Sequence, residues 1–401
     1  MNIFVINSGS SSIKYQLIRM PEARLVCSGL VERIGMTNAS ISHKTIKGIE
    51  EKILKEILEI DDHAAGLKEV ARLLIDKEVG VISNPDEIEV VGHRVVHGGD
   101  IFTATTVINE AVKTELKKLF PLGPLHLPAN YTGIIVAEKI FEKAIQVAVF
   151  DTAFHQTMPP KAFRYAIPKE LYTAHSIRAY GFHGTSHKYV SEKATEYLQK
   201  PNAKIITIHL GNGCSMAAID AGKCLDTSMG LGPLDGLIMG TRSGEIDPTV
   251  IFHLVNQLGY DINQVDTLLN KKSGLLGLTG FSDMRDVKTA EAKGDEDAIL
   301  AHQMYAYRIR KYIGAYTAVL NGLDAIVFTA GVGENDELTR KLSASNLEWL
   351  GIELDPEKNN TRIKGIHEIN TTQSKVKILI VPTNEELEIA QQCFMLLNTA
   401  I

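Results

Sequence analysis

The first seventeen residues, Met1-Asn-Ile-Phe-Val-Ile-Asn-Ser-Gly-Ser-Ser-Ser-Ile-Lys-Tyr-Gln-Leu17, decide the fold class, because they predict two strands joined by a small polar loop. Ile3 to Ile6 is an apolar run of strand length that is rich in β-branched side chains. Apolar and polar side chains then alternate from Ile13 to Leu17. The loop offers backbone N–H groups and hydroxyls to an anion, and Gly9 permits close approach. An ordinary serine-rich turn is the alternative.

The hairpin pattern recurs in the second half of the chain, which indicates an internal duplication. Lys204 to Ile219 again predicts a strand, a glycine-containing loop and a strand, and Gly211 falls opposite Gly9. A third strand that leads into a glycine turn is expected from Ala325 to Asn335. A period this long indicates a duplicated domain and not a solenoid. The sequence therefore predicts two similar units whose facing loops hold the phosphates of a nucleotide.

Candidate functional side chains in the first half of the chain lie at predicted strands and their ends. In the opening loop, Asn7 could hold a metal ion or its water, and Lys14 could reach a phosphate as a point charge. Arg94 lies in the apolar strand expected from Val90 to Val96, where its charge is costly unless it meets an anion or a carboxylate. Asp151 follows the next buried strand, at the end where open α/β sheets bind ligands. A structural ion pair and a helix cap are the alternative roles of these two residues.

The second half of the chain offers two further anion-binding candidates. His183 lies between two glycines, ahead of an amphipathic helix whose N-terminus favours anions, although a structural histidine is the alternative. Residues 226–244 form a loop far too rich in glycine for a helix interior, and Arg242 in this loop suits phosphate. We expect residues 271–280 to form another flexible segment and residues 298–320 to form one long helix.

Length and composition are those of an ordinary globular protein. A chain of 401 residues can bury a large core, most simply in two domains. The net charge of −6 and the lack of a basic stripe give no sign of nucleic-acid binding. We find no signal peptide and no apolar run that spans a bilayer, so no membrane partner is expected. The four cysteines show no Cys-x-x-Cys spacing, so reduced thiols in a cytoplasmic protein are expected.

Seven motifs along the chain together resemble the acetate and propionate kinase family. They are Asn-Ser-Gly-Ser-Ser-Ser-x-Lys at 7–14, Gly-His-Arg-Val-Val-His-Gly-Gly at 92–99, Phe-Asp-Thr-Ala-Phe-His at 150–155, Gly-Phe-His-Gly-Thr-Ser-His at 181–187, His-Leu-Gly-Asn-Gly at 209–213, Met-Gly-Thr-Arg-Ser-Gly at 239–244 and Pro-Thr-Asn-Glu-Glu at 382–386. Each motif is weak alone, but all of them in one order are highly specific and span nearly the whole chain.

The resemblance implies an α/β fold of two duplicated ribonuclease-H-like domains, of the actin, Hsp70 and sugar kinase type, with an active-site cleft between the domains. The expected domains are residues 1–151 with the C-terminal helix 386–401, and residues 152–385. The second domain is expected to bind the nucleotide and to form a homodimer. Two positions depart from the family's pattern near Arg242, because Gly232 stands where Thr is usual and Glu245 stands where Asp is usual.

The resemblance also implies site residues at the matching positions. Asn7 and Glu385 would position Mg²⁺ or Mn²⁺, and Arg94 would hold the carboxylate of the acyl substrate. The residues implied to bind ATP or ADP are Lys14, His209, Leu210, Gly211, Asn212, Gly213, Asp283, Met284, Arg285, Gly331, Val332, Gly333, Glu334 and Asn335. The residues implied to form a small apolar pocket for the methyl group are Val96, Leu125, Phe182 and Pro233.

The remaining implied roles belong to the transfer step. His183 and Arg242 would stabilise the moving phosphoryl group, and Asp151 is the family's acid or base. Because a carboxylic acid is already ionised at neutral pH, we interpret Asp151 as orienting Arg94, the substrate or water. The implied reaction is reversible, Mg²⁺-dependent phosphorylation of acetate by ATP to acetyl phosphate and ADP. No Walker A pattern occurs, so a P-loop kinase is excluded.

Two alternative functions share parts of this pattern. A propionate kinase shares every motif, and the relative kcat/KM for acetate and propionate distinguishes it. A non-enzymatic ATP switch of the actin or Hsp70 kind shares only the phosphate loops. Such a switch has no need of buried arginines on the acyl side, so Arg94 and Arg242 argue against it.

Overall fold

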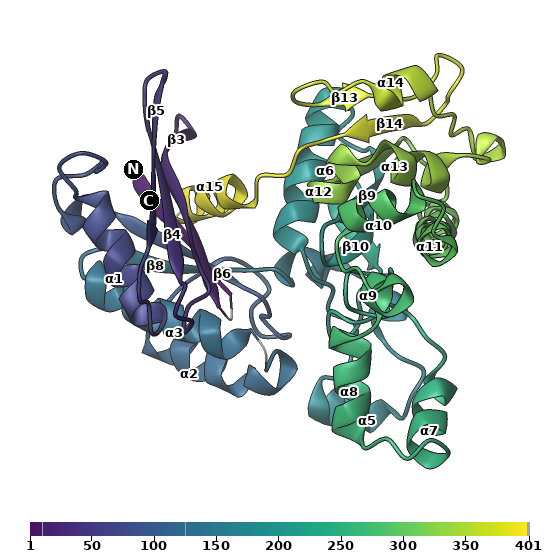
Figure 1. The fold of residues 1–401 in the computed structure, drawn as a ribbon, viewed down its shortest axis with the longest axis horizontal. Coiled ribbons are helices and arrows are strands. Elements are labelled where there is room, and N and C mark those ends of the chain that lie inside the picture. Colours follow the sequence, from purple (N-terminus) through teal and green to yellow (C-terminus); the bar gives the residue numbers. More distant parts are fainter. Residues whose placement is uncertain (10, 125, 399–401) are drawn as a thin grey trace. The chain divides into compact units, whose positions relative to one another are not determined.

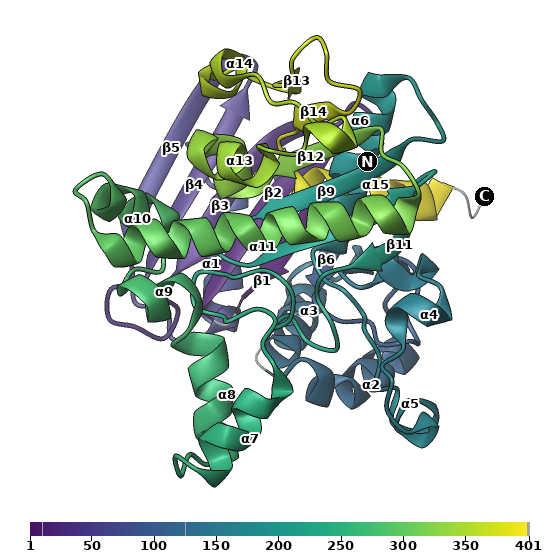
Figure 2. The same cartoon turned by 90° about the vertical axis from the view of Figure 1, so that its right-hand side faces the viewer.

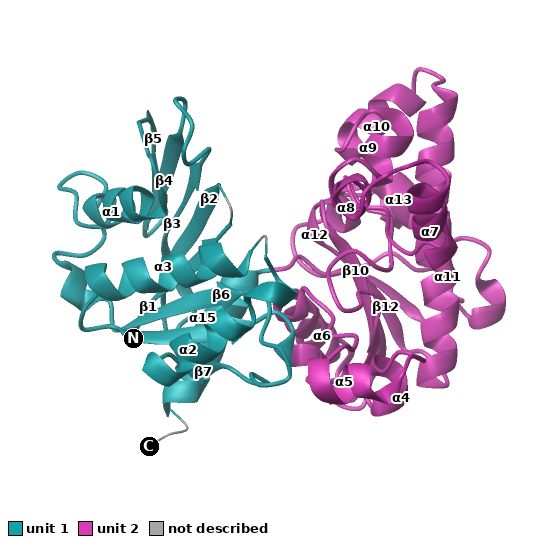
Figure 3. Cartoon of the chain, turned by 90° about the horizontal axis from the view of Figure 1, so that it is seen from below, with its two compact units in different colours: residues 1–153, 384–401 teal, residues 154–383 magenta. Residues whose placement is uncertain are grey.

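The computed structural model describes residues 1–9, 11–124 and 126–398. The chain divides into two compact units, which Figure 3 draws in different colours: unit 1 contains residues 1–153 and 384–401, and unit 2 contains residues 154–383. Unit 1 is therefore built from two separate stretches of sequence, and unit 2 from one. No helix among the described residues is both long enough and apolar enough to cross a membrane.

Unit 1 is built on one mixed sheet. Its strands are β1 (Asn2–Ser8), β2 (Ser12–Arg19), β3 (Arg24–Glu32), β4 (Ser40–Lys47), β5 (Glu50–Ile57), β6 (Val90–Val95), β7 (Thr106–Val107) and β8 (Ile145–Phe150). They lie in the order β5-β4-β3-β2-β1-β6-β8-β7. The strands from β1 to β5 pair antiparallel, whereas β1, β6 and β8 run parallel. The opening stretch is the β1–β2 hairpin, as predicted.

The helices of unit 1 cover both faces of this sheet. They are α1 (His63–Leu74), η1 (Pro85–Glu87), α2 (Glu110–Lys118), η2 (Phe120–Leu122), α3 (Leu127–Ile140) and α15 (Glu385–Asn398). Phe4 and Ile6 pack in the cluster that contains side chains of α1 and α3. Ile3 and Val5, which point to the other face, pack against Ile389 and its neighbours on α15. Figure 1 shows α1 and α15 on opposite sides of this sheet. The first strand is apolar from Ile3 to Ile6 because both of its faces are buried there.

Unit 2 repeats the same arrangement of strands. Its strands are β9 (Lys204–Leu210), β10 (Cys214–Asp220), β11 (Lys223–Thr227), β12 (Ala325–Thr329), β13 (His367–Glu368) and β14 (Lys377–Ile380). They lie in the order β11-β10-β9-β12-β14-β13. The strands from β9 to β11 pair antiparallel, and β9, β12 and β14 run parallel, as β1, β6 and β8 do in unit 1. The predicted duplication of a ribonuclease-H-like unit is confirmed.

Helices surround the sheet of unit 2. They are α4 (Pro160–Phe163), α5 (Lys169–His175), α6 (Gly184–Leu198), α7 (Pro248–Asn256), α8 (Ile262–Lys271), α9 (Gly274–Thr279), α10 (Met284–Glu291), α11 (Glu296–Leu320), α12 (Ala330–Asn335), α13 (Glu337–Ala344), η4 (Glu348–Leu350) and α14 (Pro356–Asn360), with η3 (Ala153–Thr157) where the chain enters the unit. Figure 2 shows the long helix α11 running across strands β9 to β11. The long helix predicted over residues 298–320 is confirmed.

Two local predictions were wrong, and both involved glycine. Residues 271–280 are not a flexible segment, because they contain α9, whose first turn donates backbone hydrogen bonds to the carbonyls of Met239 and Gly240. Residues 330–335 continue directly from β12 as the helix α12 and do not form an open glycine turn. In both places tertiary hydrogen bonding and packing outweigh the poor helix propensity of glycine.

Candidate active site

In unit 1, Arg94 and Asp151 form a buried ion pair at the ends of neighbouring parallel strands. Arg94 Nε and NH2 donate to the two carboxylate oxygens of Asp151 at 3.1 and 2.5 Å. The side chain of Asp151 is 1% exposed and that of Arg94 is 19% exposed. Burial alone would lower the pKa of Arg94, but Asp151 and Glu385 outweigh it and raise this pKa above its ordinary value. The arginine therefore has the carboxylate partner that its apolar strand requires.

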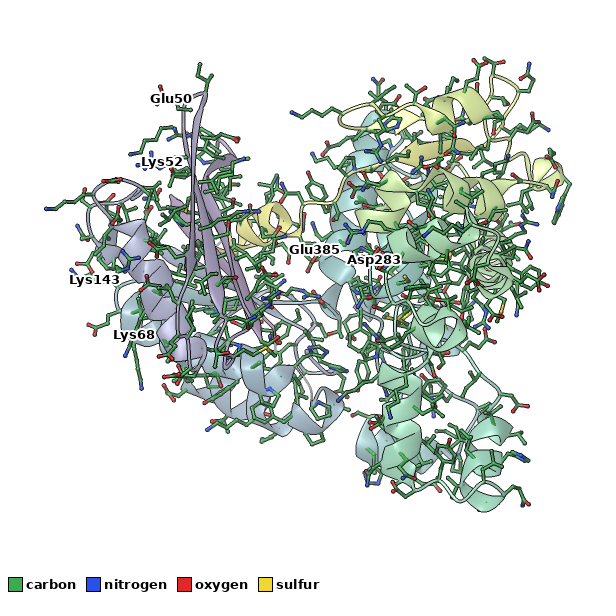
Figure 4. All side chains as sticks on the ribbon, in the orientation of Figure 1. Glu50, Lys52, Lys68, Lys143, Asp283 and Glu385 are labelled. Carbon is green, nitrogen blue, oxygen red and sulfur yellow. The ribbon has the colours of Figure 1, made fainter. Side chains whose placement is uncertain are left out.

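Two further oxygen atoms, from Asn7 and Glu385, lie near the Arg94 guanidinium. NH1 of Arg94 donates to the amide oxygen of Asn7 at 3.3 Å, and a carboxylate oxygen of Glu385 lies 3.9 Å from Nε. Glu385 is the first residue of α15 and is labelled in Figure 4. An amide oxygen and a carboxylate suit a hard cation such as Mg²⁺, which keeps several waters and takes phosphate oxygens as further ligands. Unit 1 thus brings together four of the predicted site residues.

Lys14 also lies in unit 1, directly opposite Asn7 in the β1–β2 hairpin. Its ammonium group is 2.6 Å from a carboxylate oxygen of the buried Glu386. The sequence analysis missed Glu386 and also Asn130, whose side chain accepts from Val96 N at 3.1 Å and donates to the carbonyl of Ser8 at 2.7 Å. These two residues tie the hairpin loop to α15, α3 and the end of β6. No periodicity marks them, because they act through contacts distant in sequence.

In unit 2, His183 and Arg242 meet at the β9–β10 loop. His183 precedes α6 in a left-handed backbone conformation with φ of 55°, which is unusual for a residue other than glycine. Its Nδ1 lies 2.9 Å from Ser215 Oγ, and its ring stacks on His209 with centroids 4.3 Å apart. A Cβ atom at Gly213 would lie 2.9 Å from Arg242 NH2 and 3.3 Å from the ring of His183. Gly213 is therefore what allows the loop to approach both side chains closely.

Arg242 differs from Arg94 in its partners. Its NH1 donates to the carbonyl of Pro233 at 2.5 Å, and among the described residues no carboxylate oxygen lies within 4 Å of its guanidinium. Burial lowers the pKa of Arg242. A buried guanidinium that is held by a neutral carbonyl can accept an anionic ligand without first breaking an ion pair.

A cavity of about 1120 Å³ opens beside this loop, entirely within unit 2. The predicted nucleotide-binding residues that line it are Gly211, Asn212, Asp283, Met284, Arg285, Gly331, Val332 and Asn335. Asp283, labelled in Figure 4, caps α10 and accepts from the guanidinium of Arg285, which is the main reason why its pKa is lowered to about 2. The cavity therefore joins loops and helices that are far apart in the sequence.

Some of the predicted nucleotide-binding residues do not line this cavity. His209, Leu210, Gly213, Gly333 and Glu334 are in unit 2 but outside the cavity lining. The lining residues that the sequence analysis missed include Lys288, Tyr305 and Arg362. Lys288 follows Arg285 by about one turn of α10 and pairs with Asp336 at 2.8 Å. Only that helical spacing could have indicated it from sequence.

The predicted acyl pocket is described only in part. Val96 is half-buried just after β6 in unit 1, and Leu125 lies outside the described residues. Phe182 is buried and Pro233 is half-buried, and both belong to unit 2. The acyl pocket therefore stays a prediction.

Comparisons with known proteins agree with these features. A sequence model described as the Acetokinase family matches residues 2–391. A protein of Flavobacterium johnsoniae named acetate kinase is 57% identical over 398 residues, which cover 99% of this chain and 100% of that protein. The acetate kinase structure of Porphyromonas gingivalis matches with a TM-score of 0.92 and 42% identity, covering 99% of both chains. A propionate kinase structure from Francisella tularensis subsp. tularensis SCHU S4 matches with a TM-score of 0.90 and 43% identity, covering 98% of both. The chain therefore belongs to the acetokinase family.

Proposed function

We propose that this kinase transfers the terminal phosphoryl group of ATP to acetate, forming acetyl phosphate and ADP, and that it catalyses the reverse reaction. The observation that carries the proposal is 57% identity to a protein named acetate kinase over nearly the whole chain. The geometry adds support, because each unit groups the side chains that one half of the reaction requires.

The nucleotide is proposed to occupy the large cavity of unit 2. Its phosphates would meet the backbone N–H groups of the β9–β10 loop around Gly211 and Asn212. Beside this loop, Arg242 and His183 would stabilise the charge on the equatorial oxygens of the moving phosphoryl group. Phosphoryl transfer proceeds through a loose transition state, so positioning and charge supply most of the catalysis. Lys14 of unit 1 is proposed to neutralise further phosphate charge.

The acid is proposed to bind to Arg94 in unit 1. Asp151 occupies Nε and one NH2 hydrogen, and Asn7 occupies NH1 in part, so two N–H groups of the five remain to hold a carboxylate. An oxygen of the acetate attacks the γ-phosphorus, and the bond to the bridging oxygen of ADP breaks. Because acetate is already ionised, Asp151 need not remove a proton, and its bidentate contact supports a positioning role.

We further propose that Asn7 and Glu385 hold a divalent cation, either Mg²⁺ or Mn²⁺. Bound there, the cation would supply charge to the phosphate oxygens. Arg94 contacts both Asn7 and Glu385. The same arginine would therefore help to position the acid and the two residues that hold the cation. The residues that orient the metal ligands are therefore also those that orient the substrate.

Propionate kinase activity is the second candidate, favoured by the solved propionate kinase that shares 43% identity. The acetate kinase structure and the propionate kinase structure match this chain about equally well. Fold similarity alone therefore does not choose between the two acids. The choice belongs to the acyl pocket around Val96.

We also propose a cytoplasmic homodimer. Exposed apolar side chains on unit 2, including Phe252 on α7, Ile262 on α8 and Tyr307 on α11, support association with a second copy. The four cysteines are free and buried, which suits a reducing compartment. Light scattering of the purified chain tests the dimer, and the mass of a single chain would refute it.

A hydroxylamine trap of acyl phosphate tests the activity. Purified protein is incubated with ATP and Mg²⁺ and with acetate, propionate or butyrate, and the hydroxamate formed is measured. We expect the highest kcat/KM with acetate and a strict requirement for nucleotide. Absence of acyl phosphate with all three acids would refute the kinase proposal and favour a non-enzymatic ATP switch.

A further inference from the structure

The proposed reaction makes no use of His302, a fully buried histidine in the middle of the long helix α11. Helix α11 packs against α10 and α13, two helices that contribute lining residues to the large cavity of unit 2 (Figure 2). His302 itself does not line that cavity. Any influence of this ring on a ligand must therefore pass through its neighbours.

Each ring nitrogen of His302 has a polar neighbour on a different helix. Nδ1 lies 2.7 Å from a carboxylate oxygen of Glu291 on α10, and Nε2 lies 2.8 Å from Oγ1 of Thr339 on α13. Oγ1 of Thr339 in turn lies 2.8 Å from Oδ2 of Asp336, the residue that caps the N-terminus of α13. Thr339 is 0% exposed and Asp336 is 4% exposed. A buried chain of hydrogen bonds therefore links the three helices.

One arrangement of hydrogens satisfies every contact in this chain. Burial alone would raise the pKa of Asp336, but hydrogen bonds from Lys288 and Thr339 outweigh it and lower this pKa, so the carboxylate is ionised. Among the described residues, Oδ2 of Asp336 has no donor other than Thr339, so the single hydroxyl hydrogen of Thr339 is used there. Thr339 can then only accept from Nε2 of His302. A carboxylate accepts, so Nδ1 donates to Glu291, and both ring nitrogens are donors.

Asp336 connects this chain to the wall of the large cavity. Its Oδ1 accepts from the ammonium group of Lys288 at 2.8 Å and from the backbone N–H of Leu338 at 3.1 Å. Lys288 also donates to a carboxylate oxygen of Glu337 at 3.0 Å. Asp336, Lys288 and Glu337 all line the cavity. Two of the three ammonium hydrogens are thereby engaged among the described residues, which leaves one for a ligand.

We propose that His302 is a positioning residue of the nucleotide site, which acts through Thr339 and Asp336 to hold the ammonium group of Lys288 where it donates to the bound nucleotide. This inference rests on the proposed function, because the large cavity is the proposed nucleotide site. The carboxylates of Asp336 and Glu337 outnumber the one ammonium group between them, and this excess of negative charge disfavours a phosphate oxygen there. Lys288 therefore binds a neutral acceptor of the nucleoside, a hydroxyl or a ring nitrogen.

Isothermal titration of the full chain with ADP and with ATP, in Mg²⁺ at pH 7 and without an acid substrate, tests this role. Thr339→Val keeps the shape of the side chain but lacks the hydroxyl, whereas Thr339→Ser keeps the hydroxyl and loses a methyl group. Both variants disturb the same buried position. We expect Thr339→Val to weaken ADP and ATP by the same factor, roughly three- to tenfold, the scale of one hydrogen bond. Thr339→Ser should bind both nucleotides as wild type does.

His302→Gln provides a second and independent break in the chain. A glutamine donates from a single nitrogen and cannot replace both ring nitrogens, so we expect a similar loss of nucleotide affinity. The double variant His302→Gln, Thr339→Val should bind no more weakly than the weaker single variant, because both changes break one chain. Losses that multiply in the double variant would show that the two residues act separately and would overturn the proposal.

Steady-state kinetics separates positioning from general damage to the fold. Binding that is lost equally from the ground state and the transition state raises KM alone. The KM for ATP should therefore rise in Thr339→Val by the factor seen in the titration, while kcat stays close to that of wild type. An equal fall of kcat in Thr339→Val and Thr339→Ser would indicate a structural role and contradict the proposal.

The titration also distinguishes failure of this inference from failure of the proposed function. If wild type binds neither ADP nor ATP, the proposed function is wrong and the inference falls with it. If wild type binds both and Thr339→Val binds them as tightly, the inference alone is wrong. A loss of affinity for ATP but not for ADP would place the contact on the γ-phosphate and contradict the assignment of Lys288 to the nucleoside.

Discussion

Arg94 and Arg242 are both largely buried guanidinium groups, but they differ in what balances their charge. Asp151 holds Arg94 through two hydrogen bonds, whereas Arg242 is held by the neutral carbonyl of Pro233. The first arginine is fixed before any ligand arrives, and the second lacks an anionic partner among the described residues. The two substitutions should therefore affect activity alike and stability differently.

Replacing either arginine by alanine should lower kcat by on the order of 10²-fold or more, because each supplies charge to a reacting group. Steady-state kinetics in the direction of acetyl phosphate formation measure the loss. Arg94→Ala should also destabilise the fold by roughly 3–5 kcal/mol, since it removes the cation that pairs with the buried carboxylate of Asp151.

The double variant Arg94→Ala, Asp151→Ala is the control, and it should recover part of that stability in urea unfolding. Arg242→Ala leaves no carboxylate behind and should lose less. A near-normal kcat in either single variant would remove that arginine from the mechanism.

Val96→Ala should shift the acid preference toward propionate. Val96 lies two residues beyond Arg94, a spacing that places both side chains on one face of an extended strand. One extra methylene is worth roughly 1–3 kcal/mol at most, so wild type should prefer acetate by a modest factor and use butyrate poorly. The measurement is kcat/KM for the three acids in both proteins, and an unchanged ratio would show that Val96 does not limit the pocket.

The buried His93 should cause the free energy of unfolding to fall in mild acid. The residue is 3% exposed, and its burial lowers its pKa to about 4 although the hydrogen bond with Gln146 opposes this shift. Between pH 6.5 and about 4, the unfolded chain binds a proton that the folded chain does not, so the free energy of unfolding falls as pH falls through this window. The slope from one such group is at most about 1.4 kcal/mol per pH unit.

Urea unfolding at pH 7, 6 and 5 measures this slope. His93→Gln should flatten it, while the exposed His253→Gln should leave it as in wild type. Other buried histidines, such as His187, retain part of the slope in both variants. Parallel curves for wild type and His93→Gln would contradict the assignment.

At the scale of elements, the turn of each hairpin carries the chemistry and the flanking strands set its position. The β9–β10 turn reaches the guanidinium of Arg242 and the ring of His183 because Gly213 has no side chain. The backbone hydrogen bonds from α9 to residues 239 and 240 hold the glycine-rich loop that carries Arg242. Glycine here permits close packing and does not indicate flexibility.

Gly213→Ala should therefore lower kcat by on the order of tenfold or more, since small displacements of catalytic groups are costly. The KM for ATP should change less, because the cavity wall at Gly211 and Asn212 is left in place. Gly232→Ala is the matched control, since nothing lies within 4 Å of a Cβ atom there. Equal kinetics of the two variants would mean that the loop can yield to accommodate the methyl group.

The elements that the sequence predicts well are those whose signal is local. The opening hairpin, α11 and the strand β8 follow from apolar runs and helical periodicity. The edge strand β5 was missed because its exposed residues, Glu50 to Ile57, show charges in place of a buried run. The cavity residues Lys288, Tyr305 and Arg362 were missed for another reason, because only tertiary packing brings α10, α11 and residue 362 to one wall.

At the scale of the whole molecule, the duplicated topology gives two units, and each unit has a different proposed ligand. The acid is proposed to bind in unit 1 and the nucleotide in unit 2, yet transfer requires the acid oxygen and the γ-phosphorus to come within bonding distance. The chain passes between the units at residues 153–154 and 383–384. The duplication can be predicted from the sequence because both copies repeat the same pattern of strands. The placement of one copy relative to the other cannot, because no repeated sequence pattern encodes it.

Small-angle scattering should therefore differ between the free protein and the protein saturated with a nonhydrolysable ATP analogue, Mg²⁺ and acetate. The expected change is a smaller radius of gyration, as the units converge on the reacting atoms. Acetate alone serves as the control and should change the curve less. Superimposable curves for the free and saturated protein would count against closure.

The return of the chain to unit 1 through α15 has a consequence for biosynthesis. Ile3 and Val5 on β1 are covered by Ile389, Ala390 and Cys393, which follow the whole of unit 2 in the sequence. Domains generally fold from the N-terminus as they are made, but here the first strand must wait for the whole of unit 2 to be translated. The nascent chain therefore carries an uncovered apolar sheet face until α15 has been translated, the kind of surface that chaperones bind.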